Sequence, residues 1–121
     1  MKAFVTGATG FIGANVVRAL LAKGFEVKAL MRPSSDRRNI QGLPIEVVEG
    51  DLRDLSSIKR GMEGCEVVFH VGALYSFWVR PKRLIYEVNV DGTRNVLRAA
   101  YELGMETVSY THLTLPTKRI V

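Results

Sequence analysis

The sequence predicts an α/β fold in which helices cover both faces of a parallel β-sheet. Short apolar runs of strand length alternate along the chain with segments whose apolar residues recur at helical spacing. A glycine-rich turn directly follows the first apolar run. The composition, with 47% hydrophobic and 24% charged residues, is that of an ordinary globular domain and argues against disorder.

The first part of the chain is predicted to form a strand, a helix and two further strands. The apolar runs at 2–6, 26–30 and 45–49 have strand length. Between the first two runs, residues 11–23 carry apolar side chains at helical spacing, and Gly24 follows as a stop signal. This pattern indicates a helix with one buried stripe.

The second part continues the alternation. A short helix is predicted over 55–62, with Asp54 or Ser56 as its N-cap, and a strand over 66–71. A longer helix is predicted over 82–103, where Gly92 indicates a kink or a close helix contact. A fifth strand is expected to begin at 107–110. The whole order predicts a Rossmann-type doubly wound parallel sheet, truncated after about the fifth strand.

The length and the cysteine content narrow the class of protein further. With 121 residues the chain is sized for one domain. It has no run of about 18 apolar residues and no signal-peptide core, so we expect a cytoplasmic protein without membrane contact. The single cysteine, Cys65, excludes an internal disulfide, and we predict no metal site.

The glycine turn predicts a pyrophosphate site. Gly7 would allow a tight turn out of the strand, Gly10 would leave room for a phosphate, and Gly13 would let the helix press on the sheet. The spacing G-x-x-G-x-x-G is one residue longer than G-x-G-x-x-G, so the turn is wider, and Thr6 and Thr9 could brace it. The predicted binding residues are Gly7, Thr9, Gly10, Phe11, Ile12 and Gly13. The alternative is a glycine-rich turn without a ligand; a P-loop is excluded because no Gly-Lys-Ser/Thr follows.

The end of the second strand bears on the choice of cofactor. Proteins that bind NAD usually carry Asp or Glu there to accept from the ribose 2′-hydroxyl. This chain has Arg32, and a guanidinium binds a 2′-phosphate with two donors, so NADP is favoured and NAD is the less favoured cofactor. The nearby Arg37 and Arg38 are interpreted either as part of this site or as a solvated loop.

Two more strand ends complete the predicted site. Asp51 is expected to accept from the adenine amino group while Leu52 packs on the ring; the alternative for Asp51 is an N-cap. Small residues after the fourth strand would let the ribose and nicotinamide approach the backbone at Val71, Gly72 and Ala73. His70 is interpreted as a packed residue rather than a catalytic base.

The net charge of +5 raises the alternative of a nucleic-acid-binding module. The charges are scattered, and no aromatic residues interleave with the arginines at 32–38, as a single-strand binding platform would require. We therefore expect a small-molecule partner and no nucleic acid.

Four segments together resemble the extended short-chain dehydrogenase/reductase family, over residues 1–108. They are TGATGFIG at 6–13, GDL at 50–52, HVGA at 70–73 and NVDGT at 89–93. MRPSSD at 31–36 and ALYS at 73–76 look closest to the dihydroflavonol-reductase-like and hopanoid-associated sugar epimerase branch. The resemblance implies a nicotinamide cofactor and hydride transfer at a carbonyl or sugar carbon. It also implies that Asn89 sits beside the active site, with Tyr75 and Ser76 near the substrate.

The proton-transfer pair of that family, Tyr-x-x-x-Lys, is absent from this chain. None of the 4 tyrosines has a lysine four residues later, so no catalytic residue is predicted. The segment 109–121 looks foreign to the family, and Pro116 would end a strand there. We therefore expect 1–108 to be a partial NAD(P)-binding domain from the front of a longer gene. A homodimer of that full-length parent is a further expectation.

Two functional classes follow. The first is the cofactor-binding portion of an NADP-dependent reductase or epimerase, itself inactive because its proton-transfer residues are missing. The alternative is a non-catalytic NADP-binding sensor module.

Overall fold

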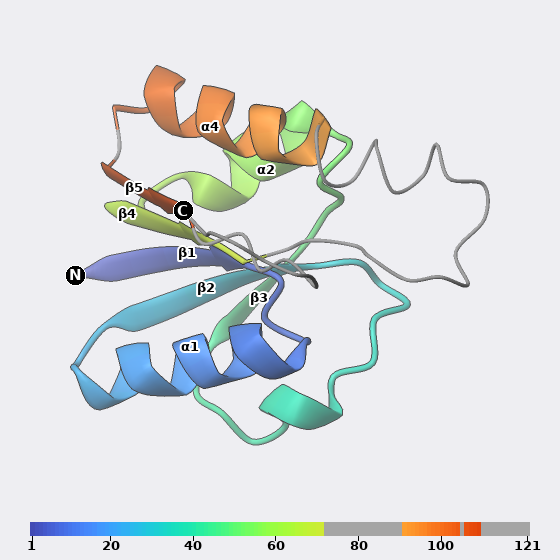
Figure 1. Ribbon diagram of the computed structural model, residues 1–121, viewed down its shortest axis with the longest axis vertical. Helices are drawn as coiled ribbons and strands as arrows, with labels where there is room; N and C mark the ends of the chain where they lie inside the picture. The colour runs from blue at the N-terminus through green and yellow to red at the C-terminus, as the bar shows by residue number, and fades with distance from the viewer. Residues whose placement is uncertain (72–90, 105, 110–121) are drawn as a thin grey trace, which may run out of the picture.

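The computed structural model of the chain describes residues 1–71, 91–104 and 106–109. A 5-stranded parallel sheet lies between two helical layers (Figure 1). Its elements are β1 (Lys2–Thr6), α1 (Phe11–Ala22), β2 (Glu26–Met31), the 3-10 helix η1 (Arg38–Ile40), β3 (Glu46–Glu49), α2 (Leu55–Met62), β4 (Val67–His70), α4 (Gly92–Glu102) and β5 (Glu106–Ser109). The predicted Rossmann-type parallel sheet is confirmed.

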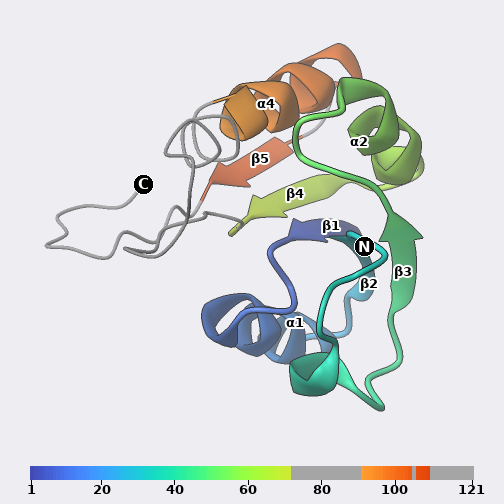
Figure 2. The same ribbon diagram turned by 90° about the vertical axis from the view of Figure 1, so that its right-hand side faces the viewer.

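The strand order is β3-β2-β1-β4-β5, so the chain runs outward from β1 and then crosses back to the other side of it. Helix α1 and η1 cover one face of the sheet, and α2 and α4 cover the other (Figures 1 and 2). In register, Thr6 at the end of β1 pairs with Leu30 of β2 and with His70 of β4. The carboxyl ends of these strands therefore meet at the point where the strand order reverses, which is where such sheets bind ligands.

Strand β1 contributes to both layers because successive side chains of a strand point to opposite faces. Ala3 and Val5 are fully buried in the α1 layer. Phe4 is fully buried in the opposite layer, and a Cβ at Gly61 of α2 would lie 3.1 Å from its ring. A strand with no exposed face explains why this run is apolar without alternation.

The helix ends follow from local chemistry. Asp54 caps α2, its Oδ1 accepting from the amides of Ser56 at 3.1 Å and Ser57 at 3.4 Å. Helix α1 ends at its C-cap Lys23, and Gly24 follows at a φ of 88° that favours glycine. Asp91 precedes α4 without capping it, and its carboxylate pairs with Arg94 at 3.1 Å. The predicted helix over 55–62 and the predicted first strand are confirmed to the residue.

Part of the predicted long helix lies outside the described residues. Helix α4 is described from Gly92 onward, while 82–90 belong to the part of the chain that is not described. A Cβ at Gly92 would lie 2.9 Å from Cβ of Leu52, so this glycine does make a close contact, but not the helix contact that was expected. The contact is with the loop between β3 and α2. Ser109, placed in the segment 109–121 by the sequence reading, is the last residue of β5, and 110–121 are not described.

Candidate functional site

The glycine-rich turn connects β1 to α1 at the carboxyl end of β1. Gly7 has a φ of 76°, which residues with a side chain rarely adopt. Gly10 is the N-cap of α1 with extended backbone, and its amide donates to the Gly7 carbonyl at 3.2 Å. The Gly10 carbonyl accepts from Ala14 at 2.9 Å and begins the helix ladder. The turn therefore places the N-terminus of α1 at the carboxyl end of β1.

Gly10 and Gly13 lack a side chain for different reasons. A Cβ at Gly13 would lie 1.8 Å from the Gly7 carbonyl oxygen, which is sterically forbidden. The sequence reading expected Gly13 to face the sheet, but the structure shows it against the turn's own backbone at Gly7 and Ala8. A Cβ at Gly10 would meet only the Gly7 oxygen, at 3.7 Å, which is ordinary contact. The described part of the fold therefore requires Gly13, whereas it leaves open space at Gly10.

The start of α1 has the properties of an anion site. The amides of its first turn, from Phe11 to Gly13, have no acceptor within the helix. No acidic residue occupies this turn, so nothing there offsets the positive end of the helix dipole. The Phe11 side chain is 75% exposed beside it. These donors and the open space at Gly10 lie together at one end of the helix.

The arginines that follow β2 differ in their partners. Arg38 forms an ion pair with Asp36 at 2.7 Å, and this hydrogen bond lowers the pKa of the Asp36 carboxyl. Arg37 lies 3.9 Å from Glu49 of β3. Arg32 is exposed, and within the described ranges its guanidinium has no hydrogen bond or ion pair. Its positive charge helps to lower the pKa of the Asp51 carboxyl, after the larger effect of Arg53.

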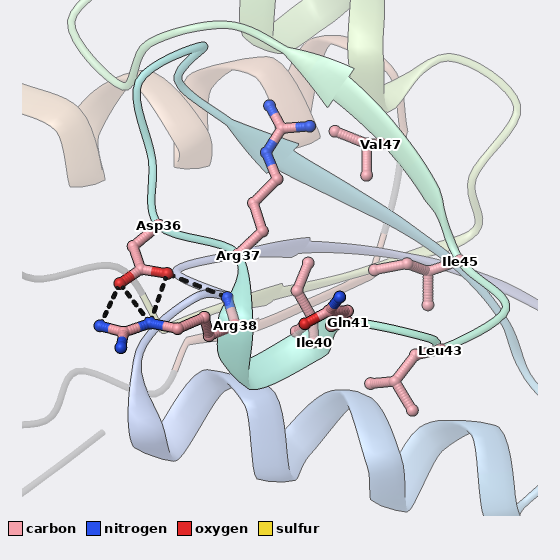
Figure 3. A pocket seen from close by; sticks show the side chains of 8 residues that line it. All are labelled: Asp36, Arg37, Arg38, Ile40, Gln41, Leu43, Ile45 and Val47. Atoms are coloured by element: carbon pink, nitrogen blue, oxygen red, sulfur yellow. Dashed lines mark hydrogen bonds and ion pairs between the residues drawn. The ribbon is translucent and has the colours of Figure 1, made fainter.

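A pocket of about 410 Å³ lies between η1 and β3 (Figure 3). It is lined by Asp36, Arg37, Arg38, Ile40, Gln41, Leu43, Ile45 and Val47. Of the residues considered for the cofactor site, Arg37 and Arg38 line this pocket, whereas the glycine turn, Arg32 and Asp51 do not. The pocket therefore borders the same loop as the predicted dinucleotide site without including its main residues.

The loop after β3 is held by several hydrogen bonds. The Asp51 carboxylate accepts from the backbone amide of Arg53 at 2.9 Å and from its guanidinium at 3.0 and 2.9 Å. The alternative reading of Asp51 as an N-cap is wrong, because Asp54 caps α2. The Leu52 carbonyl accepts from Asn95 of α4 at 3.0 Å, and the Leu52 side chain packs partly buried beneath the start of α4.

His70 links three elements. Its Nδ1 lies 2.6 Å from the Thr6 hydroxyl of β1, and its Nε2 lies 2.9 Å from the Thr93 hydroxyl of α4. The side chain is buried, and this burial lowers the pKa of His70 to about 4. The imidazole is therefore neutral near pH 7, which agrees with its interpretation as a packed residue.

The Val71 amide donates to the Thr6 carbonyl and to the Thr6 hydroxyl, at 3.2 Å in both cases. The Thr6 hydroxyl thus joins β1 to the end of β4, next to the glycine turn. Gly72, Ala73, Tyr75, Ser76 and Asn89 lie outside the described residues.

Two other expectations concern metals and membranes. No group of three metal-ligating side chains occurs among the residues that the structure describes. Cys65 is free and buried, and desolvation raises the pKa of its thiol. No helix in the described ranges has the length and apolar character to span a bilayer.

Sequence reasoning missed several residues that shape this site. Asn39 of η1 and Arg18 of α1 tie the loop after β2 to the glycine turn. Ser57 bonds the amide and the carbonyl of Asp51, at 3.1 and 3.2 Å, and Asn95 bonds Leu52. The contacts of Arg18, Asn39 and Asn95 join segments 21, 30 and 43 residues apart, so no local pattern could reveal them. Ser57 lies only six residues from Asp51, within one loop and the start of α2.

The parallel sheet, its strand-order reversal and the glycine turn at that point define a Rossmann-type fold, the class of fold in which dinucleotides bind at such a reversal. The chain belongs to the NAD dependent epimerase/dehydratase family, whose model matches residues 3–112. The resemblance to extended short-chain dehydrogenases/reductases is confirmed.

Individual relatives support the same family. Over 108 residues the chain is 50% identical to a Synechocystis protein named "Putative dihydroflavonol 4-reductase", covering 89% of this chain and 31% of that one. It is 43% identical to sterol demethylase protein B of Methylococcus capsulatus, covering 92% and 34%. The Thermus thermophilus UDP-glucose 4-epimerase, solved with NAD, is 30% identical, with a TM-score of 0.79 and coverage of 98% and 42%. The chain thus spans about a third of the length of these curated relatives.

Proposed function

We propose that this chain forms the cofactor-binding part of an NADP-preferring reductase or epimerase. The parent enzyme would transfer hydride to or from a carbonyl or sugar carbon of a small-molecule substrate. The observation that carries the proposal is the open space at Gly10, in front of the unpaired amides of α1. Because nothing in the described protein demands glycine there, a ligand against the backbone explains it.

The proposed binding residues follow the cofactor from one end to the other. Gly7, Thr9, Gly10, Phe11, Ile12 and Gly13 would hold the pyrophosphate, and Arg32 the 2′-phosphate. Asp51 and Leu52 would border the adenine, while Val71, Gly72, Ala73 and Asn89 would lie along the nicotinamide half. When bound, the nicotinamide ring supplies the hydride.

Preference for NADP is supported by the surroundings of Arg32. Asp36 and Glu49 neutralise Arg38 and Arg37, whereas Arg32 keeps its charge available within the described ranges. A guanidinium offers two parallel donors to a phosphate, and it gives a ribose 2′-hydroxyl no acceptor. We therefore expect Arg32 to favour the phosphorylated ribose.

The chain is expected to bind the cofactor without turnover. It has no Tyr-x-x-x-Lys pair, and the buried, neutral His70 is bonded at both ring nitrogens. Proton transfer would come from residues of the parent enzyme beyond this chain.

Titration calorimetry of the chain with NADP and NAD tests the proposal. NADP should bind more tightly, and Arg32→Ala should weaken NADP about tenfold while changing NAD little, because one charged contact to the 2′-phosphate is lost. Arg60→Ala is the matched control, since it removes the same charge from the exposed surface of α2. Equal affinity for the two dinucleotides, or equal losses in both variants, would contradict the NADP preference.

A further inference from the structure

The loop after β2 is fastened directly to the glycine turn. Asn39 of η1 donates from its side-chain amide to the Thr9 carbonyl at 2.9 Å. Arg18 of α1 donates from Nη2 to the Asn39 carbonyl at 2.6 Å. One residue of η1 therefore contacts both the turn and the helix that the turn begins.

The loop itself is internally ordered, so this attachment positions all of it. The Ser35 amide donates to the Arg32 carbonyl at 3.0 Å, and Asp36 accepts from the Arg38 amide at 3.0 Å. Ile40, next to Asn39, is 5% exposed and is packed in the α1 layer. Asn39 thus joins a structured segment, anchored at β2 and at Ile40, to the turn.

Asn39 joins two segments, the glycine turn and the loop after β2, that would each bind a different charged group of the same ligand. Under the proposed function, the turn holds the pyrophosphate and Arg32 holds the 2′-phosphate. The adenosine ribose joins those two groups covalently, so their separation is fixed within narrow limits. Simultaneous binding of both therefore depends on how the loop is placed relative to the turn, and small misplacements weaken such paired contacts.

We propose that Asn39 is a positioning residue for recognition of the 2′-phosphate. Its side chain holds the arginine-bearing loop at the distance from the glycine turn that NADP requires. The inference rests on the proposed function. The proposed role of Asn39 differs from a general stabilising role, because it affects binding of NADP and leaves binding of NAD largely unchanged.

The test compares Asn39→Ala with Gln41→Ala in the 121-residue chain. Gln41 is a matched control because it is an exposed amide side chain at the end of the same η1 and makes no side-chain hydrogen bond among the described residues. Titration calorimetry should show that Asn39→Ala weakens NADP about fivefold and NAD less than about twofold. Gln41→Ala should change neither affinity, and Asn39→Gln, which keeps an amide donor, should retain most of the preference.

The outcomes separate the two proposals. If the unmodified chain binds neither dinucleotide, the proposed function fails and the role of Asn39 fails with it. If the unmodified chain prefers NADP and Asn39→Ala weakens both dinucleotides equally, the proposed function stands and the role of Asn39 is overturned.

A measurement on the unmodified chain covers the case in which Asn39→Ala does not fold. The Ile40 and Gln41 amides donate to the carbonyls of Arg37 and Arg38, so their hydrogen exchange reports opening of η1. NADP should slow this exchange more than NAD does at equal saturation. Equal exchange in the two complexes would overturn the inference.

Discussion

At the scale of single residues, the glycine turn shows that identical residues can serve opposite purposes. The structure forbids a side chain at Gly13, where a Cβ would lie 1.8 Å from the Gly7 oxygen. At Gly10 the nearest described atom to such a Cβ is 3.7 Å away. The sequence pattern assigned Gly10 to a ligand and Gly13 to packing of the helix on the sheet, and the packed turn changes the second reason: Gly13 is needed because of the turn's own backbone at Gly7.

Alanine at each position should therefore give different results. Gly13→Ala should lower the free energy of unfolding by about 1–3 kcal/mol or more, because the rigid Gly7 backbone cannot move aside. Gly10→Ala should change it by less than about 0.5 kcal/mol but weaken dinucleotide binding, since the methyl group would occupy the ligand's space. Urea denaturation and calorimetry measure the two effects. If Gly10→Ala strongly destabilised the chain, or left dinucleotide binding unaltered, the distinction between Gly13 as a folding residue and Gly10 as a ligand-binding residue would be refuted.

At the scale of elements, His70 connects the ends of β1 and β4 with the first turn of α4. Both ring nitrogens lie within hydrogen-bond distance of threonine hydroxyls, at 2.6 and 2.9 Å. The chain thereby satisfies a buried polar side chain directly beneath the proposed cofactor site. Burial lowers the pKa of His70 to about 4, well below the value of about 6.5 in an unfolded chain.

This difference in pKa predicts a pH dependence of stability. Between pH 6.5 and about 4 the unfolded chain binds a proton at residue 70 that the folded chain does not. The contribution of His70 to the free energy of unfolding is therefore fully present above pH 6.5. It declines as the pH falls, by about 3 kcal/mol in total near pH 4. Urea denaturation from pH 7.5 to 4.5 measures the decline.

The control for that experiment is His70→Gln, which keeps hydrogen-bonding capacity without titrating. Its stability should fall less steeply over the same pH range, whatever its absolute stability. All other ionisable groups are common to the two proteins, so only the difference between the slopes reports on residue 70. Identical slopes would show that His70 does not titrate as its burial requires.

At the scale of the whole molecule, the proposed site is assembled from the carboxyl ends of β1, β2, β3 and β4 on a sheet with two buried layers. Strands so packed hold their carboxyl ends at fixed relative positions, which is what a long ligand such as a dinucleotide needs. A ligand that contacts several of these strand ends should stabilise the folded chain as a unit.

Binding of NADP should accordingly raise the melting temperature of the chain. At a free concentration of 100 times the dissociation constant, the stabilisation is about 2.7 kcal/mol, roughly 10 °C for a chain of this size. Thermal denaturation followed by circular dichroism measures the shift. Gly10→Ala at the same NADP concentration should shift much less; an equal shift in both proteins would indicate binding away from the glycine turn.

The sequence by itself determined the fold class, the strands and the helices α1 and α2, because apolar periodicity and the cap residues Asp54 and Gly24 act locally. It also placed the glycine turn between β1 and α1. The three-residue η1 is too short to have a periodicity, so sequence reasoning treated it as loop.

Only the tertiary structure decided which polar groups meet. It paired Arg37 with Glu49, left the Arg32 guanidinium without a hydrogen bond or ion pair in the described ranges, and joined Asn39 to Thr9. These contacts depend on the crossing of chain segments up to 30 residues apart, as between Asn39 and Thr9. Periodicity and capping are properties of neighbours in sequence, whereas the partners of a side chain are set by the packing of distant elements.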